Sequence, residues 1–334
     1  MYQNIVFSGV GTYHPANKVG NEYFIEHFKQ MDIKVEGLMN HLGRKTRYFA
    51  NRKSENVVTM GLEASRKALI NANLVPEDID MIIFATDTPE FLCPSNALLL
   101  NDQLKAKNAH LVFDLNSNCI GMLTAISVAS RIMMSDANIN KALVVGSMFA
   151  SLMASQIDPV VYSNFADSGA ALVLEKKEAP ERIGFIDSNF KTDTCVKENF
   201  LMPKVGLSKM FDASIDIEDK KLRLDPFDTS FIAKEWCELI TELLEKNNVE
   251  LSEVSNFMFS QFSKPDAELT LEMLGVDKNM HSYIGDKYGY TGVTSPIIAF
   301  HDAVKNNQVK RGDNIVFCSV GGGYNISAIL YKFY

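Results

Sequence analysis

The residue best placed to do chemistry is a cysteine at the start of an apolar helix. The segment HLVFDLNSNCIGMLTAI predicts an apolar strand, a polar turn at residues 116–118 and a helix beginning at Cys119. This helix is apolar on nearly every side, which is typical of a buried helix. Unpaired N–H groups and the positive end of the helix dipole would lower the pKa of the Cys119 thiol. The sequence therefore predicts a cysteine nucleophile; the alternative is a buried cysteine with a structural role.

The other cysteines offer no metal site. The five cysteines are far apart and odd in number, with no CxxC pair and no zinc spacing. We therefore expect no metal and a reducing, cytoplasmic location.

Charge and hydropathy exclude several classes of function. The net charge of -8 argues against nucleic-acid binding, which requires cations to neutralise phosphates. No run of about 18 uncharged apolar residues predicts a membrane span. The first residues, MYQNIVFSGVG, predict a strand and a turn rather than a signal peptide.

The elements that must position Cys119 alternate between strands and helices, which predicts a layered α/β fold. In the first half we expect strands near residues 5–9, 81–85, 110–115, 142–146 and 170–175, and helices near 55–72, 96–105 and 119–134. In the second half we expect strands near 257–259, 282–284, 314–319 and 326–331, and helices near 229–246, 266–274 and 291–305.

This order predicts two similar halves. The first, residues 1–175, carries the nucleophile, and the second, residues 176–334, carries a triple-glycine turn near its end. The polar stretch 188–228 fits neither half and is interpreted as an insertion, because long connections often form lids or binding loops.

The Cys119 turn, Asn118–Met122, resembles the nucleophile turn of β-ketoacyl-acyl-carrier-protein synthase III, a thiolase-superfamily family. Four further segments resemble that family in order and spacing: GVGTYHP at 9–15, GRKTRYFA at 43–50, SNFADSGAA at 163–171 and SVGGGYN at 319–325. The resemblance extends over nearly the whole chain.

This resemblance implies a duplicated αβαβα layered fold with mixed five-stranded sheets, and a homodimer. It implies that Cys119 takes an acyl group from a CoA or acyl-carrier-protein thioester, with no further cofactor. The backbone N–H groups of Cys119 and Gly322 would form the oxyanion hole. A glycine run suits this role, because it lets the backbone approach a substrate closely.

The resemblance breaks at two positions that the family uses for catalysis. The family's His-Gln-Ala-Asn segment is Ser260-Gln261-Phe262-Ser263 here, so Ser260 replaces the catalytic His. Its Gly-Asn-Thr-Ser segment is Gly289-Tyr290-Thr291-Gly292, so Tyr290 replaces the Asn. Neither residue can act as a base near neutral pH, although either can polarise a carbonyl or form part of a pocket wall. Of the six histidines, His281 is nearest, and we expect it to be structural.

Other substrate contacts are expected from the same resemblance. Phe91 and Cys93 lie where the family's dimer partner reaches into the acyl channel, and interface packing is the alternative. We expect substrate contacts from these two residues and from Met122, Gly321 and Gly323.

The sequence thus predicts an acyltransferase, most consistent with a 3-oxoacyl synthase III-type condensing enzyme of fatty-acid or secondary-metabolite synthesis. Transfer to an oxygen or nitrogen acceptor is the alternative, because the His and Asn positions are altered. A non-catalytic partner subunit in a heterodimeric synthase is a third hypothesis from a different class.

Overall fold

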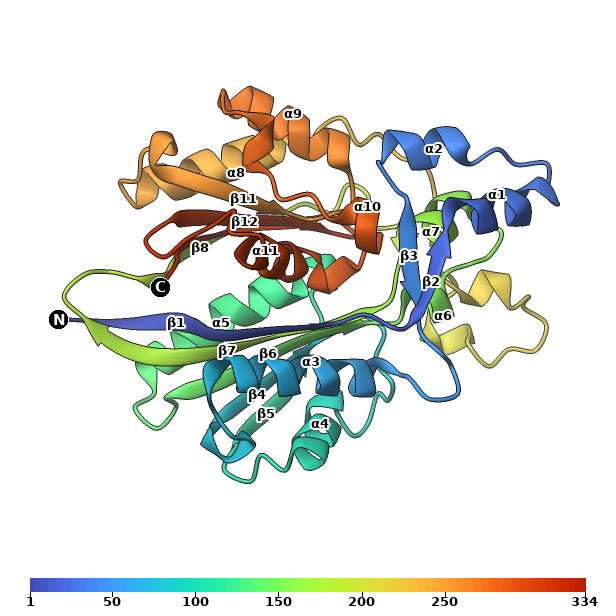
Figure 1. Ribbon diagram of the computed structural model, residues 1–334. Coiled ribbons are helices and arrows are strands. Elements are labelled where there is room, and N and C mark those ends of the chain that lie inside the picture. The colour runs from blue at the N-terminus through green and yellow to red at the C-terminus, as the bar shows by residue number, and fades with distance from the viewer.

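The computed structural model describes residues 1–334. Two β-sheets and three layers of helices alternate in a five-layered stack (Figure 1). The layers form because each sheet is apolar on both faces and needs helices on both sides.

The first sheet has five strands in the order β1-β7-β6-β4-β5. β4 pairs with β5 and β6 in parallel, and β1, β7 and β6 pair antiparallel. Every residue of β4 is buried, as expected of a central strand covered on both faces. The strands are β1 (Tyr2–Tyr13), β7 (Ser168–Ala179), β6 (Lys141–Met148), β4 (Met81–Ala85) and β5 (Leu111–Leu115).

The second sheet has four strands in the order β11-β12-β13-β8. It is one strand shorter than expected, because the segment expected near 282–284 contributes only a single bridge between Phe257 and His281. The strands are β11 (Val254–Phe259), β12 (Asn314–Gly321), β13 (Asn325–Lys332) and β8 (Gly184–Thr192).

Helices α5 (Gly121–Ser135) and α11 (Ser295–Lys305) lie between the sheets and contact both. Helices α3 (Val57–Ala72) and α4 (Asn96–Leu104) cover the outer face of the first sheet, and α8 (Ile232–Lys246) and α9 (Lys264–Leu274) cover the second (Figure 1). The α3 helix begins where predicted because Asn56 and Thr59 form a capping box.

By length and hydropathy alone, Asn118–Ser135 could cross a membrane, but 61% of this window is buried in the fold, as in a core helix.

Smaller elements gather at one end of the stack (Figure 1). The β2–β3 pair and the short helices around it have weak sequence patterns and were not predicted. These elements are β2 (Asn17–Gly20), α1 (Asn21–Lys29), α2 (Glu36–His41), β3 (Thr46–Phe49), α6 (Ala150–Met153), α7 (Pro159–Asn164), β9 (Phe200–Leu201), β10 (Arg223–Leu224) and α10 (Gly285–Tyr288).

The chain crosses from one sheet to the other between β7 and β8. β7 continues to Ala179, and β8 extends to Thr192, inside the stretch interpreted as an insertion. The irregular part of that stretch therefore begins only after Thr192, and the division into halves at residue 175 stays a prediction.

Candidate active site

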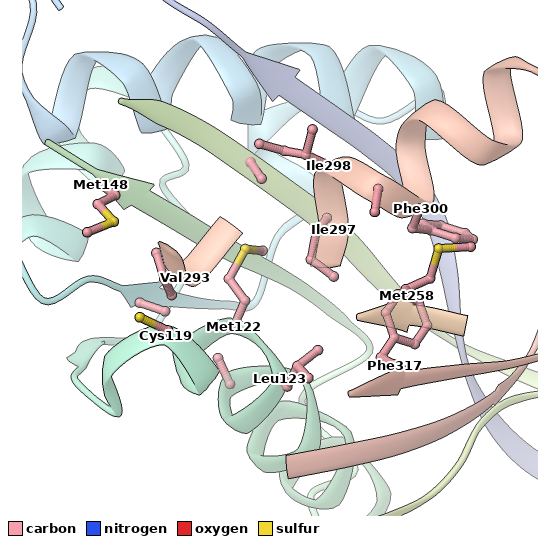
Figure 2. Packing of buried hydrophobic residues seen from close by; sticks show 14 of the residues in the cluster. Cys119, Met122, Leu123, Met148, Met258, Val293, Ile297, Ile298, Phe300 and Phe317 are labelled. Atoms are coloured by element: carbon pink, nitrogen blue, oxygen red, sulfur yellow. The ribbon is translucent and has the colours of Figure 1, made fainter. Parts of the chain in front are cut away.

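Cys119 lies in the turn that joins β5 to α5. Asn118 adopts a left-handed conformation (φ 50°), and residues Asn118–Ile120 form one 3-10 turn before the α-helix begins at Gly121. Figure 2 shows Cys119 at this helix start, at the edge of the core cluster that includes Met122 and Val293. The strand–turn–helix setting that the sequence predicts is therefore present.

The cysteine turn is tied to the glycine turn that follows β12. The Asn118 side chain donates to the Gly322 carbonyl at 2.8 Å, and the Ser319 hydroxyl donates to the Cys119 carbonyl at 3.1 Å. Two segments about 200 residues apart in sequence are thereby held side by side. This contact brings the two expected oxyanion-hole residues together.

The Gly322 position requires a glycine. A Cβ atom there would overlap the ring of Phe200, and the next residue, Gly323, has a φ of 105° that side chains rarely adopt. The backbone N–H groups of Cys119 and Gly322 both act on the Cys119 sulfur and lower its pKa. Two backbone donors next to a nucleophile can stabilise the oxyanion that forms when it attacks a thioester.

The thiol nevertheless has a raised pKa, opposite to the sequence prediction. Burial first, and the negative charge of Asp87 second, raise the pKa of Cys119 to about 12, despite the lowering effects of the Tyr290 hydroxyl and the two N–H groups. Cys119 is only 4% exposed. The prediction was wrong because a helix end contributes about 1 kcal/mol, whereas removing a charge from water costs several. The resting side chain is a neutral thiol.

Tyr290 lies at this thiol, and Ser260 lies against Tyr290. The Ser260 hydroxyl donates to the Tyr290 hydroxyl at 3.4 Å, and the Tyr290 hydroxyl interacts with Cys119. Burial raises the pKa of Tyr290 well above its ordinary value, so the phenol stays protonated. Paired backbone hydrogen bonds hold Tyr290 against α7: its N–H donates to Asn164, and its carbonyl accepts from Ala166.

His281 does not reach the thiol. Its ring lies behind Gln261, with the two side-chain nitrogens 3.3 Å apart, and burial lowers its pKa to about 3. The Gln261 amide oxygen in turn accepts from the N–H groups of Ile284 and Gly285. His281 is therefore a neutral, structural histidine, as expected.

The segment that carries Ser260 is fixed by a buried arginine. Arg44 is 1% exposed and donates to the carbonyls of Gln261 and Phe262 and to the Tyr283 hydroxyl. Arg47, also buried, bonds Asn21 and the Ser163 carbonyl. Both arginines belong to the GRKTRYFA segment at 43–50, which thus holds the Ser260 segment in place through Arg44.

A narrow apolar cavity of about 40 Å³ lies over Cys119, Tyr290 and the glycine turn. The insertion contributes Val196, Phe200, Leu224 and Phe227 to its wall, and Phe262 closes another side. Such a volume holds a water molecule but no acyl chain, so the aromatic side chains must move before a substrate enters. Sequence reasoning expected a binding loop here but did not identify Phe200 or Phe227.

The other expected substrate contacts do not meet in this cavity. Gly321 and Gly323 line it, but Met122 is fully buried in the core beside Gly146. Phe91 is 51% exposed and Cys93 is also exposed, both outside the cavity. Their predicted role depends on a second chain and stays a prediction.

Sequence reasoning also missed Asp87, whose carboxylate acts on both Cys119 and Tyr290. The available signal was its position directly after the buried strand β4, beside the strand that leads to Cys119. No group of three or more His, Cys, Asp or Glu side chains is arranged to hold a metal.

Comparisons with known proteins agree with this geometry. Residues 113–194 match the model of 3-oxoacyl-[acyl-carrier-protein (ACP)] synthase III, and residues 244–333 match the model of its C-terminal region. The chain is 30% identical over 331 residues to a β-ketoacyl-[acyl-carrier-protein] synthase III of Clostridium perfringens, covering 99% of each protein. A relative of the same name from Aquifex aeolicus is 30% identical, covering 97% of this chain and 98% of the relative.

Solved structures show the same thiolase-like fold. The 3-oxoacyl-[acyl-carrier-protein] synthase III of Aquifex aeolicus superposes with a TM-score of 0.85 at 27% identity, over 99% of this chain and all of that one. The priming β-ketosynthase of the R1128 polyketide pathway gives 0.87 at 22% identity, over 99% and 97%. From its sequence and its fold, this chain belongs to the β-ketoacyl-[acyl-carrier-protein] synthase III family of condensing acyltransferases.

Proposed function

We propose that this protein takes an acyl group from a CoA or carrier-protein thioester onto Cys119 and condenses it with a second substrate. The reaction would be of the 3-oxoacyl synthase III type, in fatty-acid or secondary-metabolite synthesis. The observation that carries this proposal is that hydrogen bonds tie the Cys119 turn to the Gly322 turn, so that both backbone N–H groups lie next to the thiol. Donors placed there can stabilise the oxygen of a thioester that the sulfur attacks.

The same observation gives the glycine turn its role. Removing one donor from an oxyanion hole typically slows the chemical step by about 100- to 1,000-fold. Because Phe200 lies directly on Gly322, a side chain at this position would displace the ring and turn the N–H away. We therefore assign Gly322 to catalysis, and Gly321 and Gly323 to shaping the path of the acyl group.

A second candidate activity follows from Ser260 and Tyr290. Both hydroxyls can donate a hydrogen bond to a carbonyl, but neither replaces the charge or basicity of a histidine. Transfer to an oxygen or nitrogen acceptor is therefore an alternative to carbon–carbon bond formation. A non-catalytic subunit of a heteromeric synthase is the further alternative, and the intact oxyanion hole argues against it.

We also propose a homodimer formed at the edge strand β5. This strand has a free edge and every residue half-buried, and nearby Phe91, Leu92 and Leu98 are about half or more exposed. An unpaired apolar edge favours pairing with a second copy. Light scattering should give twice the chain mass; the mass of one chain would contradict the dimer.

With all five cysteines free, we propose a cytoplasmic location.

The proposed function is tested by intact mass spectrometry. The protein is incubated with acyl-CoA and acyl-carrier thioesters of different chain lengths, and the mass of one acyl group should be added. The adduct should be absent in Cys119→Ala and present in the matched control Cys93→Ala, which removes an exposed cysteine. Failure to form an adduct with any donor would contradict the proposal.

A further inference from the structure

Asp87 is a buried carboxyl group close to the nucleophile. It lies two residues after β4, and Cys119 lies four residues after the neighbouring parallel strand β5. The two strands stay paired to their ends, where Thr86 donates to the Leu115 carbonyl at 3.2 Å. Because neighbouring parallel strands end at the same edge of a sheet, the segments that carry Asp87 and Cys119 begin next to each other at that edge.

The Asp87 side chain has no evident structural role. It is 9% exposed, it takes part in no ion pair, and its Oδ1 atom has no hydrogen-bond partner. A buried polar group without a partner destabilises the fold, so its presence beside a nucleophile indicates a chemical role. Burial raises the pKa of Asp87 to about 6, and only its own N–H acts in the opposite direction. The carboxylate is therefore charged at neutral pH but able to take a proton.

Asp87 lies near the thiol without bonding to it. The negative charge of Asp87 raises the pKa of both Cys119 and Tyr290, yet Asp87 forms a hydrogen bond with neither. A base for an incoming acceptor must lie about one hydrogen bond away from the acceptor atom, which itself lies about 3 Å from the acyl carbon. A carboxylate near the sulfur but not bonded to it meets this requirement.

No other group at the site can serve as this base. Ser260 is a neutral alcohol, Tyr290 stays protonated, and His281 lies behind Gln261. Asp87 is the remaining group that can accept a proton near neutral pH.

We propose that Asp87 is the general base of the second half-reaction, which removes a proton from the acceptor as it attacks the acyl group on Cys119. This proposal rests on the acyl capture proposed above. The acceptor atom forms a bond to the acyl carbon, the bond from that carbon to the Cys119 sulfur breaks, and the acceptor proton moves to Asp87. The departing thiolate then takes this proton, which restores the thiol and the carboxylate.

The proposal defines the class of acceptor. A malonyl thioester generates its carbanion by losing CO2 and needs no proton acceptor. Asp87 is required when the attacking atom loses a proton, as in the α-carbon of a thioester without a carboxylate, or in a hydroxyl group. We therefore assign the acceptor to the proton-losing class.

The lifetime of the acyl-enzyme tests this assignment. Wild type and Asp87→Asn are loaded with octanoyl-CoA and freed of excess donor. Loss of the adduct is then followed by intact mass in buffer alone, with acetyl-CoA, or with malonyl-CoA. We expect Asp87→Asn to acylate at least as fast as wild type, because the charge that raises the Cys119 pKa is gone. Its discharge in buffer and with acetyl-CoA should be about 100-fold slower or more.

The pH profile separates a base from a structural residue. Wild-type discharge should rise as the pH increases through about 6, because the charged form of Asp87 is the base, and Asp87→Asn should lose this rise. The titratable groups facing Asp87 are Cys119 and Tyr290, and neither ionises near pH 6. Malonyl-CoA should discharge both proteins with a smaller difference.

Each contrary result has a distinct meaning. Equal adduct lifetimes in wild type and Asp87→Asn would overturn the assignment of Asp87, as would a folded Asp87→Asn that fails to acylate. Absence of an adduct in wild type would instead overturn the proposed acyl capture. A thermal melt of Asp87→Asn confirms that the variant is folded.

Discussion

Two buried aspartates in the first half of the chain have the same pKa and opposite surroundings. Burial raises the pKa of both Asp87 and Asp167 to about 6. Asp167 accepts hydrogen bonds from the Ala50 N–H at 2.7 Å, the Ser151 N–H at 2.8 Å and the Ser151 hydroxyl at 2.5 Å. Asp87 has an oxygen with no partner at all.

This difference distinguishes a structural carboxylate from one available for chemistry. Asp167 joins the loop after β3 to the start of α6 and uses its oxygens to do so. The Asp87 side chain forms no hydrogen bond that links two segments, and its charge acts instead on Cys119 and Tyr290. A raised pKa alone does not identify a functional residue; a raised pKa with an unused oxygen beside a nucleophile does.

The same substitution at the two positions should therefore change stability by different amounts. At pH 8, Asp87→Asn should increase the free energy of unfolding by up to about 3 kcal/mol. The folded pKa of about 6 lies about two units above the ordinary 3.8, and each unit corresponds to about 1.4 kcal/mol. Denaturant unfolding measures this gain.

The sign of the pH dependence follows from proton binding. Because the folded state binds the Asp87 proton more tightly than the unfolded state, the charged carboxylate destabilises the fold above pH 6. This penalty falls as the pH is lowered from about 6 to about 4. The gain in Asp87→Asn should decrease over the same range, and a loss of stability at pH 8 would contradict our view of Asp87.

At pH 8, Asp167→Asn should stabilise the fold by about 2 kcal/mol less than Asp87→Asn, because both substitutions remove a buried charge of raised pKa but only this one also breaks hydrogen bonds. The amide keeps one acceptor, but its NH2 group faces a buried donor, which is left without a partner. The measurement is the same unfolding titration at pH 8. A gain equal to that of Asp87→Asn would show that the hydrogen bonds of Asp167 contribute little and would remove the contrast.

Ser151→Ala should have the smallest effect, a loss of about 1 kcal/mol. It removes the hydroxyl that donates to Asp167 and leaves both backbone donors in place. A loss of about 2 kcal/mol or more would mean that the hydroxyl, rather than the N–H groups, holds the carboxylate.

The fold and part of the site could be predicted from the sequence because their signals are local. The apolar runs of β4 and β6 and the apolar helix after Cys119 are found close to their expected bounds. The family resemblance, rather than a local pattern, brought the cysteine and glycine turns together, and these turns do meet. It also singled out Tyr290, which interacts with Cys119, and Ser260, which contacts Tyr290. Tyr290 and Phe262 line the same cavity.

The features that were missed depend on tertiary burial. A local pattern suggests a helix end that favours a thiolate, but only the packed structure shows how completely Cys119 is removed from water. Asp87 looks like one acidic residue in a loop until the parallel pairing of β4 and β5 places it beside the nucleophile. Phe200 contacts Gly322 from β9, a strand of two residues that is too short to leave a periodic pattern in the sequence.

The most direct test of acyl transfer at Cys119 is to map the acylated residue in the unmodified protein. After brief incubation with octanoyl-CoA at neutral pH, peptide mass spectrometry should find the acyl group on Cys119, although this residue is buried. Cys93 and Cys195 are exposed and should stay unmodified. Acylation confined to these exposed cysteines would indicate non-specific chemistry and contradict the account.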